Sequence, residues 1–435
     1  MLRRLRRWLS IGSEQRLKAW LMGLTLTILV FKILIIPYPW PALPPEECTY
    51  EAKSGCGFIF DEAHYVRAVR MMINGKWDVN LEHPPLAKLL IMLGIFTFGD
   101  NPWGWRTLIT ICGAASVYLV GLLAYRLTGS FKASVIAAAL FGFDITSFNI
   151  SSIAMLDAPA LAFSLLGAYL YLRRRLILSG LSFGLAMLSK LSAAFILAAI
   201  LLYDLARASH RGASFRDAIR DWIGVFERIF FTALIILATG LWAYDCTHGT
   251  YQTPFEHLDS MLYYHSILKF SEGDAVDMPL SWTNPISPFP RVPYFVATAQ
   301  VDSLKTYHPI AYYGVQTPLW WMTWVVFIFA IYLAYLRSRA GEFPGLELFT
   351  LFWLLMNYLI YFPLAHILHR WVYSFYFYNS VPAIAIAISR LLEGERFSEL
   401  VLYLLLISQL CCFFYFFPVK PQWYIDFLLW LGLPA

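Results

Sequence analysis

Long runs of apolar residues, separated by short polar turns, dominate this chain. A helix that crosses a membrane needs about 20 predominantly apolar residues, with about 17 to 25 usual. The pattern therefore predicts an all-α polytopic membrane protein with about eleven transmembrane helices, three of them short. The predicted crossing segments are residues 19–38, 106–125, 133–150, 157–172, 176–189, 191–205, 229–246, 317–336, 346–363, 373–389 and 398–417.

Basic residues mark every second turn, which fixes an orientation because cytoplasmic turns are enriched in Lys and Arg. The predicted inside turns carry Arg126, Lys132, Arg173, Arg174, Arg175, Arg207, Arg211, Arg216, Arg220, Arg228, Arg337, Arg339, Arg390 and Arg396. We predict one integral membrane domain over 1–435, with a basic amphipathic cytoplasmic segment at 1–18. Two large outer loops follow, at 39–105 and 247–316, and the tail 418–435 rests on the outer interface.

Composition agrees with a bilayer as the solvent. Hydrophobic residue types make up 59% of the chain and charged types 14%, against about 25% in an average soluble domain. The 16 Trp and 26 Tyr suit aromatic belts at two membrane interfaces. The net charge of +5 does not indicate a nucleic-acid partner, because the basic residues lie in the turns between apolar runs.

The first outer loop concentrates ionisable groups. In "FIFDEAHYVRAVRMM" the carboxylates Asp61 and Glu62 precede His64 at the start of a predicted helix. Asp61 suits a helix N-cap, and a carboxylate above an apolar floor equally suits a general base. A second short apolar helix follows "EHPP", so we expect two interface helices in this loop.

Cations on the predicted outer side run against the usual charge bias. His83 and Lys88 in "EHPPLAK", Arg106 in "NPWGWR" and Lys190 in "AMLSKLSA" are candidates to hold an anionic phosphate. For Lys88 the alternative is a side chain that snorkels from an interface helix.

Further candidates lie downstream. His265 in "MLYYHSILKF" is either a surface residue or part of the site, and Tyr378 in "WVYSFYFYNS" belongs either to an aromatic belt or to a wall on which a sugar stacks. Cys48 and Cys56 share the first outer loop, where an oxidising compartment would allow a disulfide. No cysteine pattern predicts zinc.

The order of "FDEAHYVRA", "LEHPPLAKLLIMLGIFTFGDNPWGWR", "AMLDAPALAFSLLGAYLY", "GLAMLSKLSA", "MLYYHSILKF" and "FYFYNSVPAIAI" resembles that of the protein O-mannosyltransferases, which use dolichyl-phosphate-mannose. The resemblance covers most of the chain. It implies a glycosyltransferase type C fold and an inverting enzyme that moves mannose from a polyprenyl phosphate to Ser or Thr hydroxyls of proteins. It also implies that Asp61 is the catalytic aspartate. From the residues themselves we predict that Glu62 orients the acceptor or the base, and that the donor is bound by His64, His83, Lys88, Arg106, Lys190, His265 and Tyr378.

Eukaryotic members of that family carry a β-trefoil in the second outer segment, and 247–316 is too short for one. The resemblance therefore implies a prokaryotic type in the plasma membrane, with its site on the extracytoplasmic face. No cofactor is required; a divalent metal is left open, as is a dimer. The alternatives are a same-fold transferase for a lipid or glycan acceptor, such as the aminoarabinose transferases, whose motifs favour Arg and Lys where this chain has His64 and His83, and a lipid-linked sugar transporter. A transporter would place polar groups at mid-membrane.

Overall fold

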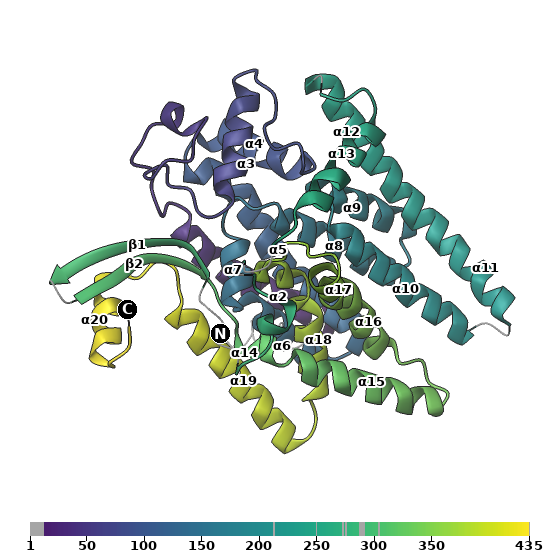
Figure 1. The fold of residues 1–435 in the computed structure, drawn as a ribbon. Helices are drawn as coiled ribbons and strands as arrows, with labels where there is room; N and C mark the ends of the chain where they lie inside the picture. Colours follow the sequence, from purple (N-terminus) through teal and green to yellow (C-terminus); the bar gives the residue numbers. More distant parts are fainter. Residues whose placement is uncertain are drawn as a thin grey trace, which may run out of the picture.

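The computed structural model describes residues 13–211, 214–248, 250–271, 274, 276–286, 292–302 and 305–434. Throughout these ranges the regular structure is helical apart from one antiparallel hairpin (Figure 1). Most of the predicted cytoplasmic segment 1–18 lies outside the described residues, and the described chain begins at the start of α2.

The described residues include seven helical segments long and apolar enough to cross a membrane, which agrees with a polytopic membrane protein. Three of them are composite: α11 and α12 are joined by a π-helical turn, α16 is continued by another into α17, and α14 leads directly into α15. The segments are α2 (Ser13–Ile35), α5 (Pro102–Thr128), α10 (Ala193–Arg211), α11 (Phe215–Phe226) with α12 (Thr232–His248), α14 (Pro318–Trp321) with α15 (Thr323–Arg339), α16 (Gly345–Leu354) with α17 (Tyr361–His366), and α19 (Arg396–Tyr415).

The other four predicted crossing segments correspond to shorter apolar helices. Two agree with the predicted bounds to the residue, and 133–150 is divided in two because Asp144 ends one helix and caps the next. The count of eleven crossings stays a prediction. The shorter helices are α6 (Phe131–Gly142), α7 (Ile145–Ile150), α8 (Asp157–Leu172), α9 (Leu176–Ser189) and α18 (Val381–Leu391).

Helix α5 is the central element of the bundle, where it contacts α2, α4, α6 and α8. Its ends follow from local sequence: the Asn101 side chain accepts a hydrogen bond from the Trp103 amide at 2.9 Å, and Gly129 adopts φ 69° after the last turn. Near its start, a Cβ on Gly94 of α4 (Leu86–Phe98) would overlap the carbonyl oxygen of Gly104. The short outer helix therefore lies directly on the α5 backbone.

The predicted outer elements gather at one end of the bundle. α3 (Glu62–Ile73), α4 and α13 (Pro254–Ile267) lie there, and the ends of α10 and α15 lie at the other (Figure 1). The two helices expected in the first outer loop are confirmed as α3 and α4.

The second outer segment departs from the all-α prediction. It contains β1 (Val292–Asp302) paired with β2 (Lys305–Gly314), and this hairpin extends from the bundle beside α20 (Gln422–Trp430) (Figure 1). The alternating Val, Tyr, Phe and Thr residues of β1 and β2 favour strands because branched and aromatic side chains suit a half-buried sheet.

Topology is testable by labelling. In a background lacking Cys246 and Cys411, Trp77→Cys and Phe215→Cys place thiols at side chains that are 75% and 80% exposed. An impermeant thiol reagent added outside intact cells should label only the Trp77→Cys variant, and lysis should make the Phe215→Cys variant reactive. Equal labelling of both variants before lysis would contradict the predicted orientation.

Candidate active site

Glu62 and Arg106 form a closed ion pair beneath the first outer loop, and both side chains are fully buried. The Arg106 Nε and Nη2 atoms each lie 2.7 Å from a Glu62 carboxylate oxygen. The same carboxylate accepts the backbone amides of Ile59 at 2.8 Å and Ala154 at 2.7 Å. The four acceptor positions of a carboxylate are thereby used.

Arg106 has no donor left for a substrate. Its remaining N–H groups donate to the carbonyl oxygens of Ile36, Tyr38 and Gly57, at 2.7, 2.9 and 3.0 Å. A guanidinium has five N–H groups, and here five acceptors from the protein receive them. The prediction that Arg106 holds the donor phosphate is therefore wrong for this structure: Arg106 ties the end of α2 to the first outer loop.

The prediction that Lys88 holds the donor phosphate is wrong for the same reason. Its ammonium is fully buried and donates to Asp78, to the Asn80 carbonyl and, at 3.0 Å, to the His83 carbonyl. These three acceptors match the three N–H groups of an ammonium. Lys88 thus folds the segment 78–83 onto α4, and neither the phosphate nor the snorkelling interpretation holds.

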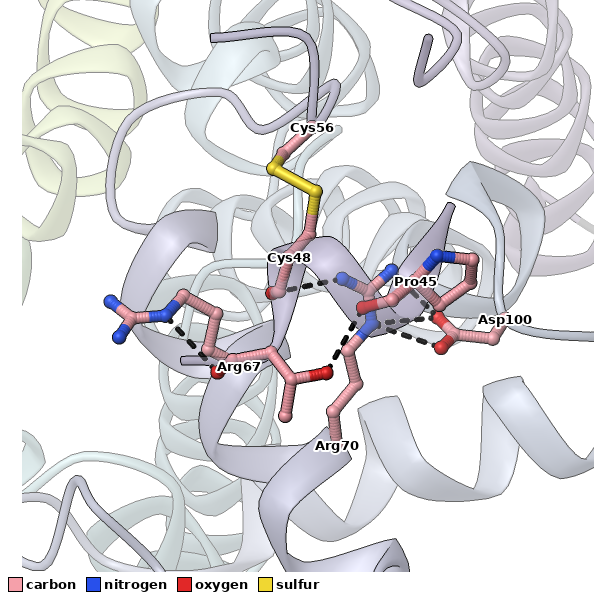
Figure 2. The surroundings of a disulfide bond; sticks show 7 residues. Pro45, Cys48, Cys56, Arg67, Arg70 and Asp100 are labelled. Atoms are coloured by element: carbon pink, nitrogen blue, oxygen red, sulfur yellow. Dashed lines mark hydrogen bonds and ion pairs between the residues drawn. A yellow bond between two sulfur atoms is a disulfide. The ribbon is translucent and has the colours of Figure 1, made fainter. Parts of the chain in front are cut away.

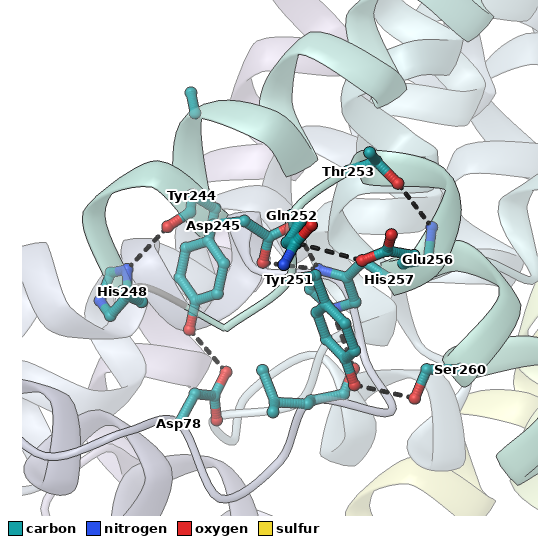
Figure 3. A network of polar contacts seen from close by, with 12 residues as sticks. Asp78, Tyr244, Asp245, His248, Tyr251, Gln252, Thr253, Glu256, His257 and Ser260 are labelled. Atoms are coloured by element: carbon teal, nitrogen blue, oxygen red, sulfur yellow. Dashed lines mark hydrogen bonds and ion pairs between the residues drawn. The ribbon is translucent and has the colours of Figure 1, made fainter.

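A polar network from the second outer segment supports that folded segment from the other side (Figure 3). Tyr244 donates to Asp78 at 2.7 Å. The buried His257 ring lies 3.1 Å from an Asp245 oxygen through Nδ1 and 3.2 Å from the Leu81 carbonyl through Nε2. Glu82 and His83 are consequently held between α4, α12 and α13.

The predicted disulfide between Cys48 and Cys56 is present in the structure, and an ion pair of Arg70 with Asp100 lies next to it (Figure 2). Arg70 donates to Asp100 from Nε at 2.9 Å and to the Cys48 carbonyl at 3.1 Å. The disulfide and this ion pair fasten the segment before Asp61 to the outer face of α3 and α4.

Asp61 occupies the cap position of α3, but its side chain makes no capping hydrogen bond. It is partly exposed, whereas the adjacent Glu62 is buried, because neighbouring helical positions point about 100° apart. Burial raises the pKa of the Asp61 carboxyl, opposed by the nearby Lys190 and His64 and by a hydrogen bond with Tyr65. The capping interpretation thus does not account for Asp61.

Lys190 lies near Asp61, and its charge acts to lower the pKa of that carboxyl. Its ammonium lies 2.7 and 2.9 Å from the two oxygens of Asp157, and 5.2 and 5.3 Å from the ring centres of Phe375 and Tyr376. Asp157, which sequence reasoning did not single out, therefore belongs to the candidate site.

Burial disfavours the charged form of two histidines in the cluster, His83 and His265. Burial lowers the pKa of His83 well below its usual value, with Lys190 and His265 adding to the effect. Burial, together with Arg370 and Lys190, lowers the pKa of His265 to about 4. The His83 and His265 rings lie 5.5 Å apart. At neutral pH they offer hydrogen bonds to a ligand and no positive charge, which corrects the predicted cationic role of His83; His64 is exposed beside Asp61.

Arg370 is the cation that the sequence analysis missed. It donates to the His265 carbonyl, and its Nη2 lies 3.3 Å from His265 Nδ1. Among the described residues no carboxylate lies within ion-pair distance of it. Arg370 lies in the predicted outer turn between residues 363 and 373, so the outer-cation signal that selected Arg106 applies to it equally.

Tyr378 is fully buried and packs on Phe141 with ring centres 6.1 Å apart, so it cannot form a wall for a sugar. The aromatic residues beside the cluster are Tyr373, Phe375 and Tyr376 from the same run. Phe375 lies 5.2 Å from Phe60, the residue before Asp61.

Comparison with known proteins relates this chain to mannosyltransferases. The model of the dolichyl-phosphate-mannose-protein mannosyltransferase family matches residues 82–258. Two curated polyprenol-phosphate-mannose–protein mannosyltransferases are similar, that of Corynebacterium glutamicum at 35% identity over 127 residues and that of Mycolicibacterium smegmatis at 32% over 163 residues. The family model and both relatives therefore show similarity to protein O-mannosyltransferases over part of this chain.

The matches are partial. They cover 26% and 36% of this chain and 24% and 29% of those mannosyltransferases, so the chain spans about a quarter of the length of the curated relatives it matches. The family match contains Asp157 and Lys190 but begins after Asp61.

Solved structures show the fold over a longer range. The S. cerevisiae protein O-mannosyltransferase Pmt1-Pmt2 complex bound to the sugar donor aligns with a TM-score of 0.68 at 10% identity, covering 95% of this chain and 92% of that one. The transferase ArnT from Cupriavidus metallidurans aligns at 0.53 and 16% identity, over 89% and 62%. The chain therefore has the glycosyltransferase type C fold, as expected.

If Arg106 is structural, its removal destabilises the fold. If it binds the donor phosphate, its removal weakens donor binding. Removing one partner of a buried ion pair leaves the other charge uncompensated, which costs about 3–5 kcal/mol. We expect Arg106→Ala to lower the thermal unfolding temperature in detergent strongly, and Glu62→Gln to do the same. An Arg106→Ala protein that unfolds at the wild-type temperature but no longer binds donor would restore Arg106 as a phosphate ligand.

Proposed function

We propose that this protein is an inverting glycosyltransferase that moves mannose from a polyprenyl phosphate to Ser or Thr hydroxyls of proteins. Similarity to the mannosyltransferase family over residues 82–258 supports the donor and acceptor classes, and the integral membrane fold suits a lipid-linked donor. The single observation that carries the proposal is Asp61, a partly exposed carboxylate without a capping bond, grouped with Lys190 and neutral histidines. We place the site on the extracytoplasmic face of a plasma membrane because the basic turns lie at the opposite end.

The proposed step needs a base and a cationic site. A Ser or Thr oxygen attacks the anomeric carbon from the side opposite the phosphate, forming one C–O bond while the bond to the phosphate oxygen breaks. Asp61 takes the hydroxyl proton, and the electron pair leaves with the polyprenyl phosphate. Lys190 and Arg370 suit the charge that develops on that phosphate, in surroundings where burial strengthens each interaction.

In this proposal Glu62 does not contact the acceptor. Its carboxylate is saturated by Arg106 and two backbone amides, so it positions Asp61 by fixing the first residue of α3. Glu82, partly buried and with a pKa raised by burial, is the other carboxylate of the cluster. The described residues offer nothing to support a dimer, and we do not propose one.

We expect Asp61→Asn to reduce mannose transfer by about 10²–10⁴-fold while the unfolding temperature stays unchanged, because the side chain provides no cap. Glu82→Gln is the matched control and should retain most activity. Assays with purified protein, polyprenyl-phosphate-mannose and a Ser/Thr peptide give the rate; other lipid-phosphate sugars and lipid acceptors in parallel test the alternative transferases. Loss in Glu82→Gln with activity kept in Asp61→Asn would reassign the base.

The same base predicts a pH dependence. The ionised carboxylate accepts the proton, so activity is lost as the pH falls through the pKa of Asp61. Because burial raises that pKa, the acid limb of kcat/KM should lie above the ordinary aspartate value of about 3.9. A limb at or below the ordinary value would contradict a buried base.

Arg370→Gln should lower kcat/KM for the donor roughly ten- to a hundredfold, the range for one charge-assisted hydrogen bond. The exposed neighbour Lys269, replaced in Lys269→Gln, is the control. Since two side-chain cations serve the phosphate in this proposal, we expect a chelator to leave the wild-type rate unchanged. An Arg370→Gln enzyme with wild-type kcat/KM would remove Arg370 from the donor site.

A further inference from the structure

A cavity of about 540 Å³ lies at the end of the bundle opposite to Asp61. It is bounded by the last turns of α5 and α18, the first turns of α16 and most of the length of α15. Along α5 the 21 residues from Arg106 to Leu127 correspond to about 30 Å of helix, so the cavity is separate from the candidate active site. It belongs to the end where the basic turns predict the cytoplasm.

One wall of the cavity is an apolar stripe. Val326, Phe329, Ala330 and Leu333 of α15 line it at spacings of three and four residues, which place them on one helix face. From Val326 to Arg337 this face extends about 16 Å into the predicted membrane. A slot of this length and lining suits a hydrocarbon chain.

The mouth of the cavity is charged. Arg337 pairs with Glu347 at 3.2 Å, and Arg390 pairs with Glu393 at 3.2 Å. Both arginine side chains are nearly half exposed, at 46% and 43%, so each keeps donors for an anion. An amphiphile with a phosphate at its head fits this combination of slot and mouth.

The buried side chain of Glu347 places a second requirement on the ligand. The residue is only 5% exposed, and its Oε2 atom has no hydrogen-bond partner among the described residues. A buried carboxylate oxygen without a donor is costly, and a cationic N–H group is the strongest partner for it. The missing partner is therefore a donor that the ligand itself supplies next to its phosphate.

We propose that this cavity binds a phospholipid of the inner leaflet whose headgroup is phosphoethanolamine. The ammonium donates to Glu347, the phosphate accepts from Arg337 and Arg390, and one chain lies along the α15 stripe. This headgroup is neutral overall, like the two ion pairs at the mouth. A phosphocholine headgroup has the same charges but no N–H, so it lacks the bond to Glu347.

The test is native mass spectrometry of the full chain, titrated with phosphatidylethanolamine, phosphatidylcholine or phosphatidylglycerol of identical chains. We expect phosphatidylethanolamine to bind roughly ten- to a hundredfold more tightly than phosphatidylcholine. Glu347→Gln should abolish that preference, whereas Glu342→Gln, an exposed acid outside the cavity, should keep it. Glycerophosphoethanolamine, which has no chains, should not compete, since the slot contributes to binding.

Two outcomes would overturn the proposal: equal affinity for the ethanolamine and choline lipids in the wild type, or an undiminished preference in Glu347→Gln. Tighter binding of phosphatidylglycerol would assign the mouth to an anionic lipid instead. If Glu347→Gln does not fold, Ala330→Phe fills the slot without touching the mouth and should displace the lipid; retained binding would then contradict the proposal. None of these measurements depends on mannose transfer.

Discussion

The ion pair between Glu62 and Arg106 is the constraint on which the outer end of this protein depends. The pair brings together the end of α2, the segment before α3, the start of α5 and the link between α7 and α8. It does so through its own two hydrogen bonds and five further ones to backbone groups. A buried ion pair stabilises only when its remaining donors and acceptors are satisfied, and here they are. The segment that carries Asp61 therefore has one position relative to α8, and with it to Asp157 and Lys190.

Two adjacent carboxylates thus have different roles because a helix turns about 100° per residue. Glu62 faces inward and is saturated, while Asp61 faces the cluster with no partner that would hold it as a cap. Burial makes the Glu62–Arg106 pair rigid. It also raises the pKa of Asp61 and lowers the pKa values of His83 and His265. A neutral histidine pair leaves the positive charge of the cluster to Lys190 and Arg370, on the side where a phosphate would be needed.

Helical periodicity, charge bias and family motifs were sufficient to predict the helices, the outer loops and the position of Asp61. Residues 157–172 and 176–189 match their helices because each ends at a residue that local sequence defines, such as the arginines from Arg173 to Arg175. The partners of the cations were not predictable in this way. Arg106 and Lys190 look alike in sequence, but Arg106 meets a carboxylate 44 positions away and Lys190 meets one 33 positions away. Only the tertiary fold decides which carboxylate each cation reaches. The hairpin was missed because Pro and Gly suggested a loop, although its alternating aromatic and branched residues favour strands.

In such a membrane protein, structural cations can be told from functional ones by counting how many of their N–H groups already donate to the protein. An outer-side cation costs free energy to bury, so it signals either a substrate or a structural partner. Arg106 has five N–H groups and five protein acceptors, and Lys88 has three of each, so binding a phosphate would require breaking bonds in the interior. Among the described residues, the Lys190 ammonium donates to one carboxylate, and the Arg370 side chain has hydrogen-bond contacts with His265. The free donors therefore lie on the residues that surround Asp61, and the saturated ones lie beneath it, where they hold the first outer loop in place.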